Sequence, residues 1–497
     1  MTVPPPATRP AAGPGPAESP TDTAALRRAA LRGGIVGNFV DQLHIFLPLT
    51  ALAPALPALV GDDAVAGTAA LAITATLLGR PLGAVVFGRL ADRAGRTRVT
   101  QAAIAGTAAC TAAIALLPDH RAIGGAAMAL VLLLRFAGGM FLAGEYTSAV
   151  PLAMEWAKPR RRGLLSGLIM AMAPWAQATV AVSTLILLAL LGPSAYAAYG
   201  WRCAFGAGAL ASLAVLLYYR RRVADARPAP AVARERSAAR GNPEAQGGPE
   251  ARCGTEPAAG SVRALVAGAQ ARAFWQVFAL MSGLWLLTNM VVLQLAAALS
   301  AHTVGAALPA QAQPLVMAVA AVAQALVMSA TGQLSTLLGR RRFFVAAGLL
   351  AAADGPAVYA LLAGGRGLLA VCLLAAALQA VTVTAYGPVG AYLAERFPAH
   401  QRSVGYGAAY SVSIVIPALY PLWLPPLGVM LGSPTAAVGL VLALGGLLVA
   451  GAGALGPALR PAELDAAMAR PTVGAGGEAD VQPDPAHASA AGRRGGS

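Results

Sequence analysis

Apolar residues along this chain form long uninterrupted blocks rather than the amphipathic stripes of a soluble helix. A helix needs about 20 apolar residues to cross the roughly 30 Å of hydrocarbon in a bilayer, and blocks of that length recur. The sequence therefore predicts an all-α integral membrane protein with twelve transmembrane helices, at about residues 32–56, 64–88, 97–117, 123–150, 164–191, 200–219, 273–300, 311–337, 342–363, 367–393, 403–427 and 435–457.

The positions of the charged residues orient these helices. The chain is 57% hydrophobic and only 11% charged, and its net charge is +15. In a soluble protein such a charge would suit nucleic-acid binding, but here the basic residues lie in alternate connections between the apolar blocks. Basic clusters stand at 93–98, 158–162, 220–222, 340–342 and 396–402, whereas the opposite connections hold little more than Arg121 and Arg366. We therefore predict cytoplasmic termini, a multi-pass protein of the cell (inner) membrane and no nucleic-acid partner.

Changes in composition divide the chain into domains. Residues 1–27 and 459–497 are rich in Pro, Gly and Ala, which predicts disordered cytoplasmic tails, and residues 223–270 have the composition of a cytoplasmic linker. Between them lie an N-terminal six-helix bundle, 28–222, and a C-terminal six-helix bundle, 271–458. The four cysteines and five histidines lack metal-ligand spacing, and no phosphate-binding loop or nucleophile motif is present. We expect no metal, no cofactor and no enzymatic activity.

Two sequence signals repeat between the halves. The stretch GRLADRAGRTR, Gly88–Arg98, recurs as GQLSTLLGRRR, Gly332–Arg342, each between the second and third helix of its half. Glu155 and Arg162 in EWAKPRRRG have the same separation as Glu395 and Arg402 in ERFPAHQRS. Two signals at nearly one offset indicate a duplication. A repeat of six helices implies two bundles related by an axis along the membrane normal, with a cavity at their interface near mid-membrane.

These motifs resemble those of the major facilitator superfamily, over nearly all of residues 30–457. The resemblance rests on G-x-x-x-D-R-x-G-R-x-R between helices two and three, on Arg135 in helix four, and on E-x6-R after helices four and ten. The stretches RPLGAVVFGRLADRAGR, LRFAGGMFLAGEYTSAV and GPVGAYLAERFP are similar to its metabolite:proton symporter branch, whose members import dicarboxylates, citrate, shikimate or zwitterionic osmolytes. Helix one departs from that pattern, because His44 stands where a second acidic residue is usual.

The resemblance implies that residues at the cytoplasmic ends of the helices gate the cavity. Asp92 would pair with cationic and helix-end groups of the other half in one conformation only, as a latch, while Gly88 and Gly95 allow close approach in a tight turn. The alternative is that the arginines of this loop only set topology. The predicted gate residues are Gly88, Asp92, Arg93, Gly95, Arg96, Glu155, Arg162, Gly339, Arg340, Glu395 and Arg402.

Ionisable residues inside the predicted helices are candidates for the transport site, because each costs about 2.5–3.5 kcal/mol there. They are Asp41 and His44 in helix one, Arg80 in helix two and Arg135 in helix four. Asp41 and Arg80 share a depth, so the two can pair. We expect Arg135 or Arg80 to hold an anionic group of the substrate or the deprotonated Asp41, and protonation of Asp41 or His44 to release it. A structural clamp for Arg80 and a buried neutral imidazole for His44 are the alternatives.

The second half offers neutral polar groups. Trp285 and Asn289 lie four residues apart on helix seven, and Gln379, Thr382 and Tyr386 share a face of helix ten. Asn289 and Gln379 are candidates for hydrogen bonds to a substrate, and helix packing is the alternative.

Together these features predict a secondary active transporter with alternating access. The leading hypothesis is proton-coupled uptake of a small anionic or zwitterionic metabolite by a monomer in the lipid bilayer. A proton-driven exporter of a drug or siderophore-like compound is the alternative, although helix five, SGLIMAMAPWAQATV, lacks the glycines usual in antiporters. A third hypothesis is a membrane enzyme or a non-transporting sensor on the same scaffold. The sequence does not favour it, because it contains no recognisable set of catalytic residues.

Overall fold

The helices of this chain form two bundles that lie side by side. The computed structural model describes residues 20–56, 68–157, 159–223, 266–300, 303–304, 312–397 and 402–458, and the regular structure in these ranges is helical. The first bundle contains α1 (Pro20–Phe46), α3 (Thr68–Ala94), α4 (Arg96–Ala115), α6 (Ala126–Trp156), α7 (Arg162–Ala195) and α8 (Trp201–Arg222). A short helix, α5 (His120–Ile123), precedes α6.

The second bundle also contains six spans, and three of them are interrupted. The continuous spans are α13 (Ala312–Leu338), α14 (Arg340–Ala363) and α20 (Pro434–Ala454). The interrupted spans are α11 (Ala271–Thr288) with α12 (Leu295–Ser300), α15 (Leu368–Val383) with α16 (Val389–Arg396), and α17 (Arg402–Val412) with α18 (Val415–Ala418) and α19 (Tyr420–Met430). The predicted class, two six-helix bundles, is therefore confirmed.

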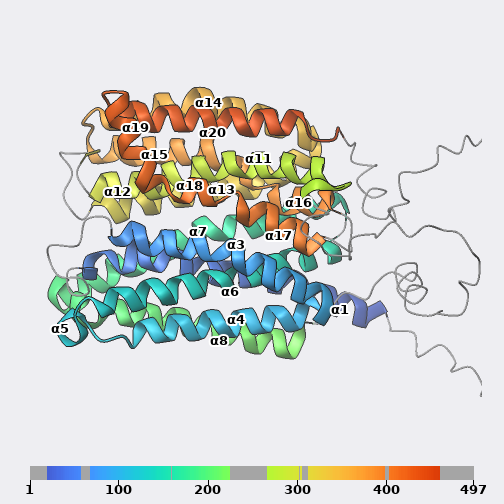
Figure 1. Cartoon of the computed structure of the whole chain (residues 1–497), viewed down its shortest axis with the longest axis horizontal. Coiled ribbons are helices and arrows are strands. Elements are labelled where there is room, and N and C mark those ends of the chain that lie inside the picture. Colours follow the sequence, from blue (N-terminus) through green and yellow to red (C-terminus); the bar gives the residue numbers. More distant parts are fainter. Residues whose placement is uncertain are drawn as a thin grey trace, which may run out of the picture.

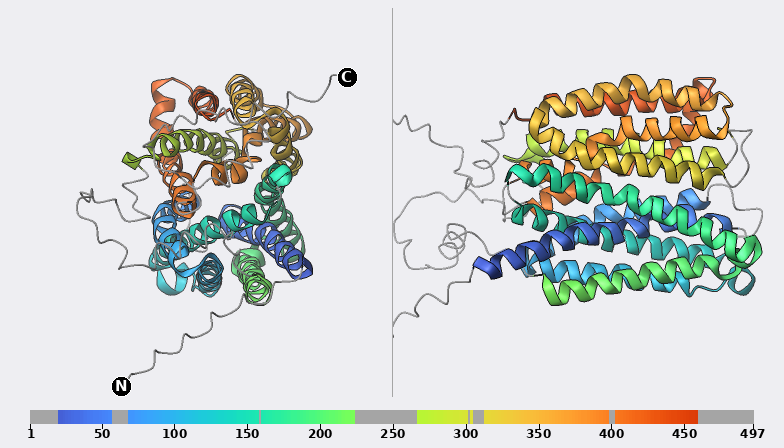
Figure 2. Two further views of the ribbon diagram at one scale, coloured as in Figure 1. Left: turned by 90° about the vertical axis from the view of Figure 1, so that its right-hand side faces the viewer. Right: turned by 180° about the vertical axis from the view of Figure 1, so that it is seen from behind.

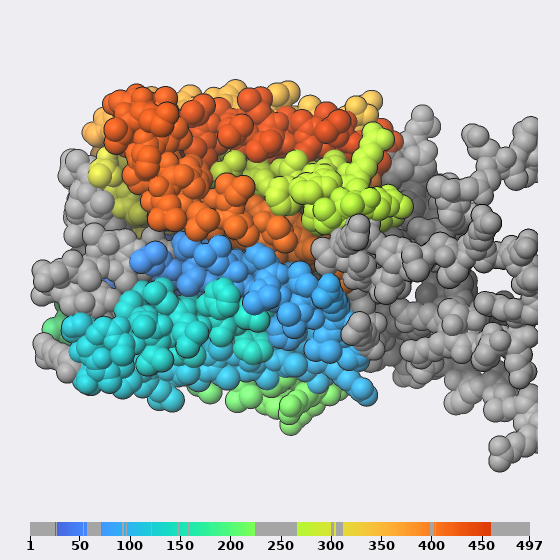
Figure 3. Space-filling view, viewed as in Figure 1, coloured from blue at the N-terminus to red at the C-terminus, as the bar shows by residue number. Residues whose placement is uncertain are grey.

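The bundles are stacked, with their long helices running in the same direction (Figure 1). Seen along that direction, the first bundle occupies one half of the section and the second bundle the other (Figure 2). The space-filling view shows side chains of both bundles meeting along a continuous boundary (Figure 3). Any site between them is therefore built from residues far apart in the sequence.

The outer faces of the helices are apolar. Large aliphatic side chains point outward, among them Leu133, Leu190, Leu210, Leu369 and Val429, which are 62–83% exposed. Among the described residues eight helical segments are long and apolar enough to cross a membrane, and the bent pair Val404–Ala418 and Tyr420–Met430 adds a ninth. One of the eight, Arg162–Arg222, comprises both α7 and α8. Such a surface suits lipid, since helices satisfy their own backbone hydrogen bonds there.

The two copies of the repeated loop make the same turn. Gly95 joins α3 to α4 with a φ of 93°, and Gly339 joins α13 to α14 with a φ of 87°. Glycine adopts this region of φ without the steric cost that a side chain brings. The repeated motif therefore places equivalent turns at equivalent points of the two bundles.

One boundary and one helix type differ most clearly from the sequence prediction. Helix α1 begins at Pro20, so residues 20–27 of the predicted disordered tail are helical, because TAALRR is composed mainly of good helix formers. The helical span that starts at Ala271 changes to a wider π-helical stretch, η6, at Asn289–Gln294. Most of the predicted tails and of the linker 223–270 lies outside the described residues.

Candidate functional site

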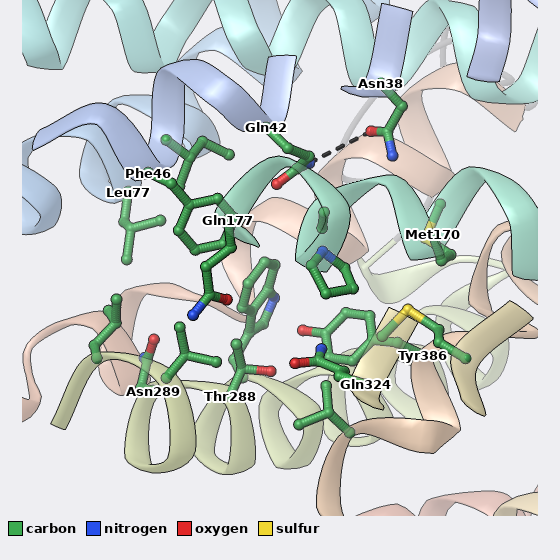
Figure 4. A pocket seen from close by; sticks show the side chains of 18 of the residues that line it. Asn38, Gln42, Phe46, Leu77, Met170, Gln177, Thr288, Asn289, Gln324 and Tyr386 are labelled. Carbon is green, nitrogen blue, oxygen red and sulfur yellow. Dashed lines mark hydrogen bonds between the residues drawn. The ribbon is translucent and has the colours of Figure 1, made fainter. Parts of the chain in front are cut away.

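A central cavity of about 90 Å³ lies between the two bundles, at the middle of the helices that line it. The first bundle contributes Asn38, Gln42, Arg80 and Gln177 among its polar lining residues, and the second contributes Thr288, Asn289, Gln324 and Tyr386. Figure 4 shows the side chains of Gln177, Thr288 and Asn289 converging on one space from opposite sides. The remaining lining is mainly aliphatic and aromatic, so the cavity has the mixed character of a small-molecule site.

Arg80 brings a positive charge to this cavity. Its side chain is only 3% exposed, and its guanidinium carbon lies 5.9 Å from the ring centroids of both Trp285 and Tyr410. These rings belong to the second bundle, where the Trp285 Nε1 donates to the Tyr410 carbonyl at 3.1 Å. In the part of the chain that the structure describes, no acidic side chain pairs with Arg80 within 4.0 Å. A guanidinium placed beside aromatic rings in this way can therefore bind an anionic group of a ligand, because it donates charge-assisted hydrogen bonds.

Three amide atoms in the cavity wall have no hydrogen-bond partner among the described residues. They are the Gln177 Nε2 and the Asn289 Nδ2, both donors, and the Gln324 Oε1, an acceptor. All three residues are nearly fully buried. Buried polar atoms are nearly always satisfied in folded proteins, so a group of unsatisfied atoms facing one cavity indicates a binding site for a polar ligand or water.

Two carboxyl groups meet in the first bundle, near Arg80. The Asp41 side chain of α1 hydrogen-bonds with the Glu145 side chain of α6, and Asp41 also has an electrostatic interaction with Arg80. Asp41 is 4% exposed and Glu145 is 3% exposed. The predicted partner of Asp41 was Arg80, but its hydrogen-bonded partner is Glu145. Sequence reasoning missed Glu145, although an acidic residue within the apolar block 123–150 is the same kind of signal as Arg135.

Arg135 lies inside the first bundle rather than in the cavity. Its Nε donates to the Thr76 hydroxyl at 3.1 Å, and its Nη2 donates to the carbonyl of His44. It therefore joins α6 to α3 and α1. Of the two arginines predicted to hold an anionic group, only Arg80 is among the residues that line the cavity.

His44 is a buried imidazole bonded on both ring nitrogens. Its Nε2 lies 2.6 Å from the Ser212 hydroxyl of α8, and its Nδ1 lies 3.0 Å from the Thr111 hydroxyl of α4. The residue is 1% exposed. The surroundings match the predicted alternative of a neutral imidazole that holds neighbouring helices together.

The two neutral candidates of the second half have different surroundings. Asn289 is the first residue of η6 and lines the cavity. Gln379 is fully buried in α15, where its Nε2 donates to the Val291 carbonyl at 3.0 Å. Val291 lies within η6, so Gln379 satisfies a backbone group in a stretch where the regular α-helical pattern changes.

The bundles also make direct contacts on both sides of the cavity. Towards the predicted cytoplasmic side, the Ser166 hydroxyl of α7 donates to the Gly387 carbonyl at 2.7 Å and accepts from the Ala391 N–H at 3.1 Å. Towards the opposite side, the Thr74 hydroxyl of α3 donates to the Ala418 carbonyl at 3.3 Å. These bonds join the two halves on both sides of the cavity.

The predicted gate residues of the second half form an ion pair. Arg340, at the start of α14, holds Glu395 with its Nη2 3.1 Å from Oε1 and its Nε 3.3 Å from Oε2. Arg340 also donates to the hydroxyls of Ser335 and Thr336. Glu395 was expected to act with Arg402, whose Nε donates to the Ala394 carbonyl at 3.0 Å. Arg340, which pairs with Glu395, therefore belongs to the repeated glycine-loop motif GQLSTLLGRRR and not to ERFPAHQRS.

The matching gate of the first half is only partly described. Arg162 is buried at the first residue of α7. The side chains of Asp92, Arg93, Arg96 and Glu155 lie outside the described residues. The roles predicted for them, and for Gly88, stay predictions.

The helices form two bundles with a cavity of mixed character between them, and comparisons with known proteins specify the family. The model of the Major Facilitator Superfamily matches residues 42–421. The chain therefore belongs to this superfamily, whose members are multi-pass membrane transporters and not enzymes.

Individual relatives agree with this assignment. The chain is 27% identical to the "Inner membrane metabolite transport protein YhjE" of Escherichia coli K12, over 79% of this chain and 86% of that protein. It is 32% identical to the "Ectoine/proline transporter ProP" of Corynebacterium glutamicum, over 36% of this chain and 37% of that protein. The structure of the proton:xylose symporter XylE superposes with a TM-score of 0.61 at 14% identity, over 87% of this chain and 94% of that one. The last likeness shows the shared fold.

Proposed function

We propose that this protein takes up a small zwitterionic carboxylate together with protons, and that Arg80 holds the carboxylate. The observation that carries the proposal is a buried guanidinium that lines the central cavity and has no acidic side chain within 4.0 Å among the described residues. A carboxylate is the natural partner for such a group, because a charge-assisted hydrogen bond is about twice as strong as a neutral one.

The rest of the cavity favours a zwitterion over a dicarboxylate. Arg80 is the one charged residue among the described residues that line the cavity, so a second carboxylate would enter without a cation to pair with it. The aromatic rings of Trp285 and Tyr386, with centroids 5.8 Å apart, offer π-faces for a cationic group, and the amides of Asn289 and Gln324 offer hydrogen bonds. The names of several relatives, which include a proline/betaine transporter of Escherichia coli, support this substrate class.

The mechanism that we propose needs only a monomer, because the residues of the proposed site all come from one chain. The two halves would rock about their interface and expose the cavity to each side in turn, while Arg80 would hold the carboxylate at the central site. Export of a large drug-like compound is not favoured, because the relatives are named for small metabolites such as ectoine and proline, and the cavity of about 90 Å³ suits a small solute.

The test is transport by the purified protein in liposomes. Labelled glycine betaine, proline, succinate and xylose would be offered separately, with an inward proton gradient and then with a protonophore. We expect betaine or proline to accumulate above its equilibrium level and the protonophore to abolish that accumulation. Accumulation of succinate alone would contradict the zwitterion, and proton-driven extrusion of the solute would contradict the direction of transport.

A further inference from the structure

We propose that Asp41 and Glu145 form one proton-binding unit, in which Glu145 is as necessary as Asp41 for coupling protons to transport. This inference rests on the proposed proton-coupled function and assigns its proton site to a pair of carboxyl groups. The structure brings the two side chains together from α1 and α6, which lie far apart in the sequence.

The contact itself requires a proton. An ionised carboxylate only accepts hydrogen bonds, so two carboxyl groups hydrogen-bond to each other only when at least one of them is protonated. Both residues are at least 96% buried, and two negative charges within hydrogen-bonding range of each other in such surroundings are strongly disfavoured. The arrangement seen here therefore needs at least one proton on the pair.

The packing around the pair is built to keep the carboxyl groups together. Gly37 lies one turn before Asp41, and a Cβ at Gly37 would come within 3.1 Å of the Glu145 Oε1 and 3.6 Å of the Tyr219 hydroxyl. A side chain at this position would therefore crowd the Glu145 carboxyl group. Tyr219 of α8 is itself 1% exposed, so bulk water does not reach the pair from that side.

The other charged and titratable groups near the pair are few. Arg80 approaches the pair from α3, and Tyr219 approaches it from α8. The one titratable residue of α7 is Arg162, which is the first residue of that helix. His44 and Arg135 belong to the same helices as the pair, but they bond to Thr111, Ser212 and Thr76 instead. Arg80 is thus the cation that responds to the charge of the pair.

Proton binding to the pair would prepare Arg80 for substrate. With one shared proton, the pair carries one negative charge, which balances the positive charge of Arg80 across the first bundle. A second proton makes the pair neutral, and the guanidinium then has a full charge to offer a carboxylate in the cavity. One proton would enter with each zwitterion, so each cycle would move one positive charge, and an inside-negative potential would drive uptake.

The experiment compares Glu145→Gln, Asp41→Asn and the control Asp354→Asn, which changes a partly exposed carboxyl of α14. Each variant is assayed in liposomes for proton-driven accumulation of labelled betaine and proline, and for exchange of labelled against unlabelled solute without a gradient. We expect both pair variants to lose accumulation while exchange stays within about threefold of wild type, and the control to keep both. Loss of accumulation in Asp41→Asn but not in Glu145→Gln would overturn the shared site.

A second measurement is independent of the substrate. Infrared difference spectra between acidic and alkaline buffer report protonated carboxylic acids through their C=O stretch. We expect wild type and the Asp354→Asn control to show a buried carboxylic-acid band that either pair variant shifts or removes. An unchanged band in Glu145→Gln would overturn the proposal, even if the transported solute turned out to differ from betaine and proline.

Discussion

The two halves of this transporter share an architecture but differ in their chemistry. Arg80 and Gln324 each stand eight residues before the first glycine of the repeated loop motif, and both line the central cavity. Similarly, Glu145 stands ten residues before Glu155, whereas Ala385 stands ten residues before Glu395. The first half thus has ionisable groups where the second half has an amide or a methyl group. The two halves thus share a helical frame and differ in the chemistry of equivalent positions.

This division has a physical benefit. Each buried charge is costly in a membrane protein, so grouping the charges in one bundle lets them compensate one another, as Asp41, Glu145 and Arg80 do. In the proposed mechanism the second bundle supplies aromatic faces and amides that would bind a solute without adding charge to the cavity. In this proposal proton binding and solute recognition would meet at Arg80, which belongs to the first bundle and lies beside two aromatic rings of the second.

The strongest test of this division makes the first half resemble the second at one position. Arg80→Gln should lower uptake at limiting substrate by about 100-fold, because a buried charged partner of a ligand carboxylate contributes roughly 2–5 kcal/mol. Uptake would be measured in liposomes at equal protein content. The control is Arg89→Gln, which removes an exposed arginine from the same helix. Uptake within a few-fold of wild type in Arg80→Gln would mean that the carboxylate binds elsewhere.

A second test concerns the line where the halves meet. A Cβ at Gly332 of α13 would lie 2.3 Å from the Gly163 carbonyl oxygen and 2.6 Å from the Gly167 Cα of α7. Gly332→Ala should therefore separate the bundles on the predicted cytoplasmic side. Overpacking costs about 1–3 kcal/mol and would raise the free energy of the conformation in which α7 and α13 are in contact. Because the transport cycle passes through that conformation, we expect the transport rate to fall by about tenfold.

The matched control for Gly332 is Gly451→Ala in α20, where an added Cβ meets nothing within 4 Å. The same variants would be labelled with a thiol reagent after placing a cysteine at Ser329, next to the crossing. We expect faster labelling with Gly332→Ala and no change with the control. Equal labelling and equal transport in the two variants would show that this glycine contact does not hold the inner side closed.

The comparison also shows what the sequence could predict. The blocks of apolar residues and the repeated glycine loops are local signals, so the twelve spans and the turns at Gly95 and Gly339 follow from them directly. The cavity depends on how each helix is rotated about its axis, and that rotation is set by packing against distant segments. This is why Arg80 and Arg135 were equal candidates from the sequence, although only Arg80 faces the cavity.

Other features of the structure have no local signal in the sequence. The π-helical stretch Asn289–Gln294 reads NMVVLQ, with no glycine or proline to signal a change of helix type. The pair of Asp41 with Glu145 depends on α1 packing against α6, which no spacing along the chain reveals. Long-range pairing of this kind becomes visible only when the helices are placed together.

The smallest expected effect is that of His44→Gln. This variant tests whether every ionisable group of the first half takes part in coupling. Both ring nitrogens already bond to hydroxyls, so His44→Gln should cost about 1 kcal/mol for each hydrogen bond lost. Its thermal midpoint should fall by a few degrees, while the dependence of uptake on external pH stays as in wild type. Uptake would be measured between acidic and alkaline pH beside Asp41→Asn. If His44→Gln alters the pH dependence as strongly as Asp41→Asn does, the imidazole belongs to the proton pathway, and coupling extends beyond the carboxyl pair to the contacts between α1, α4 and α8.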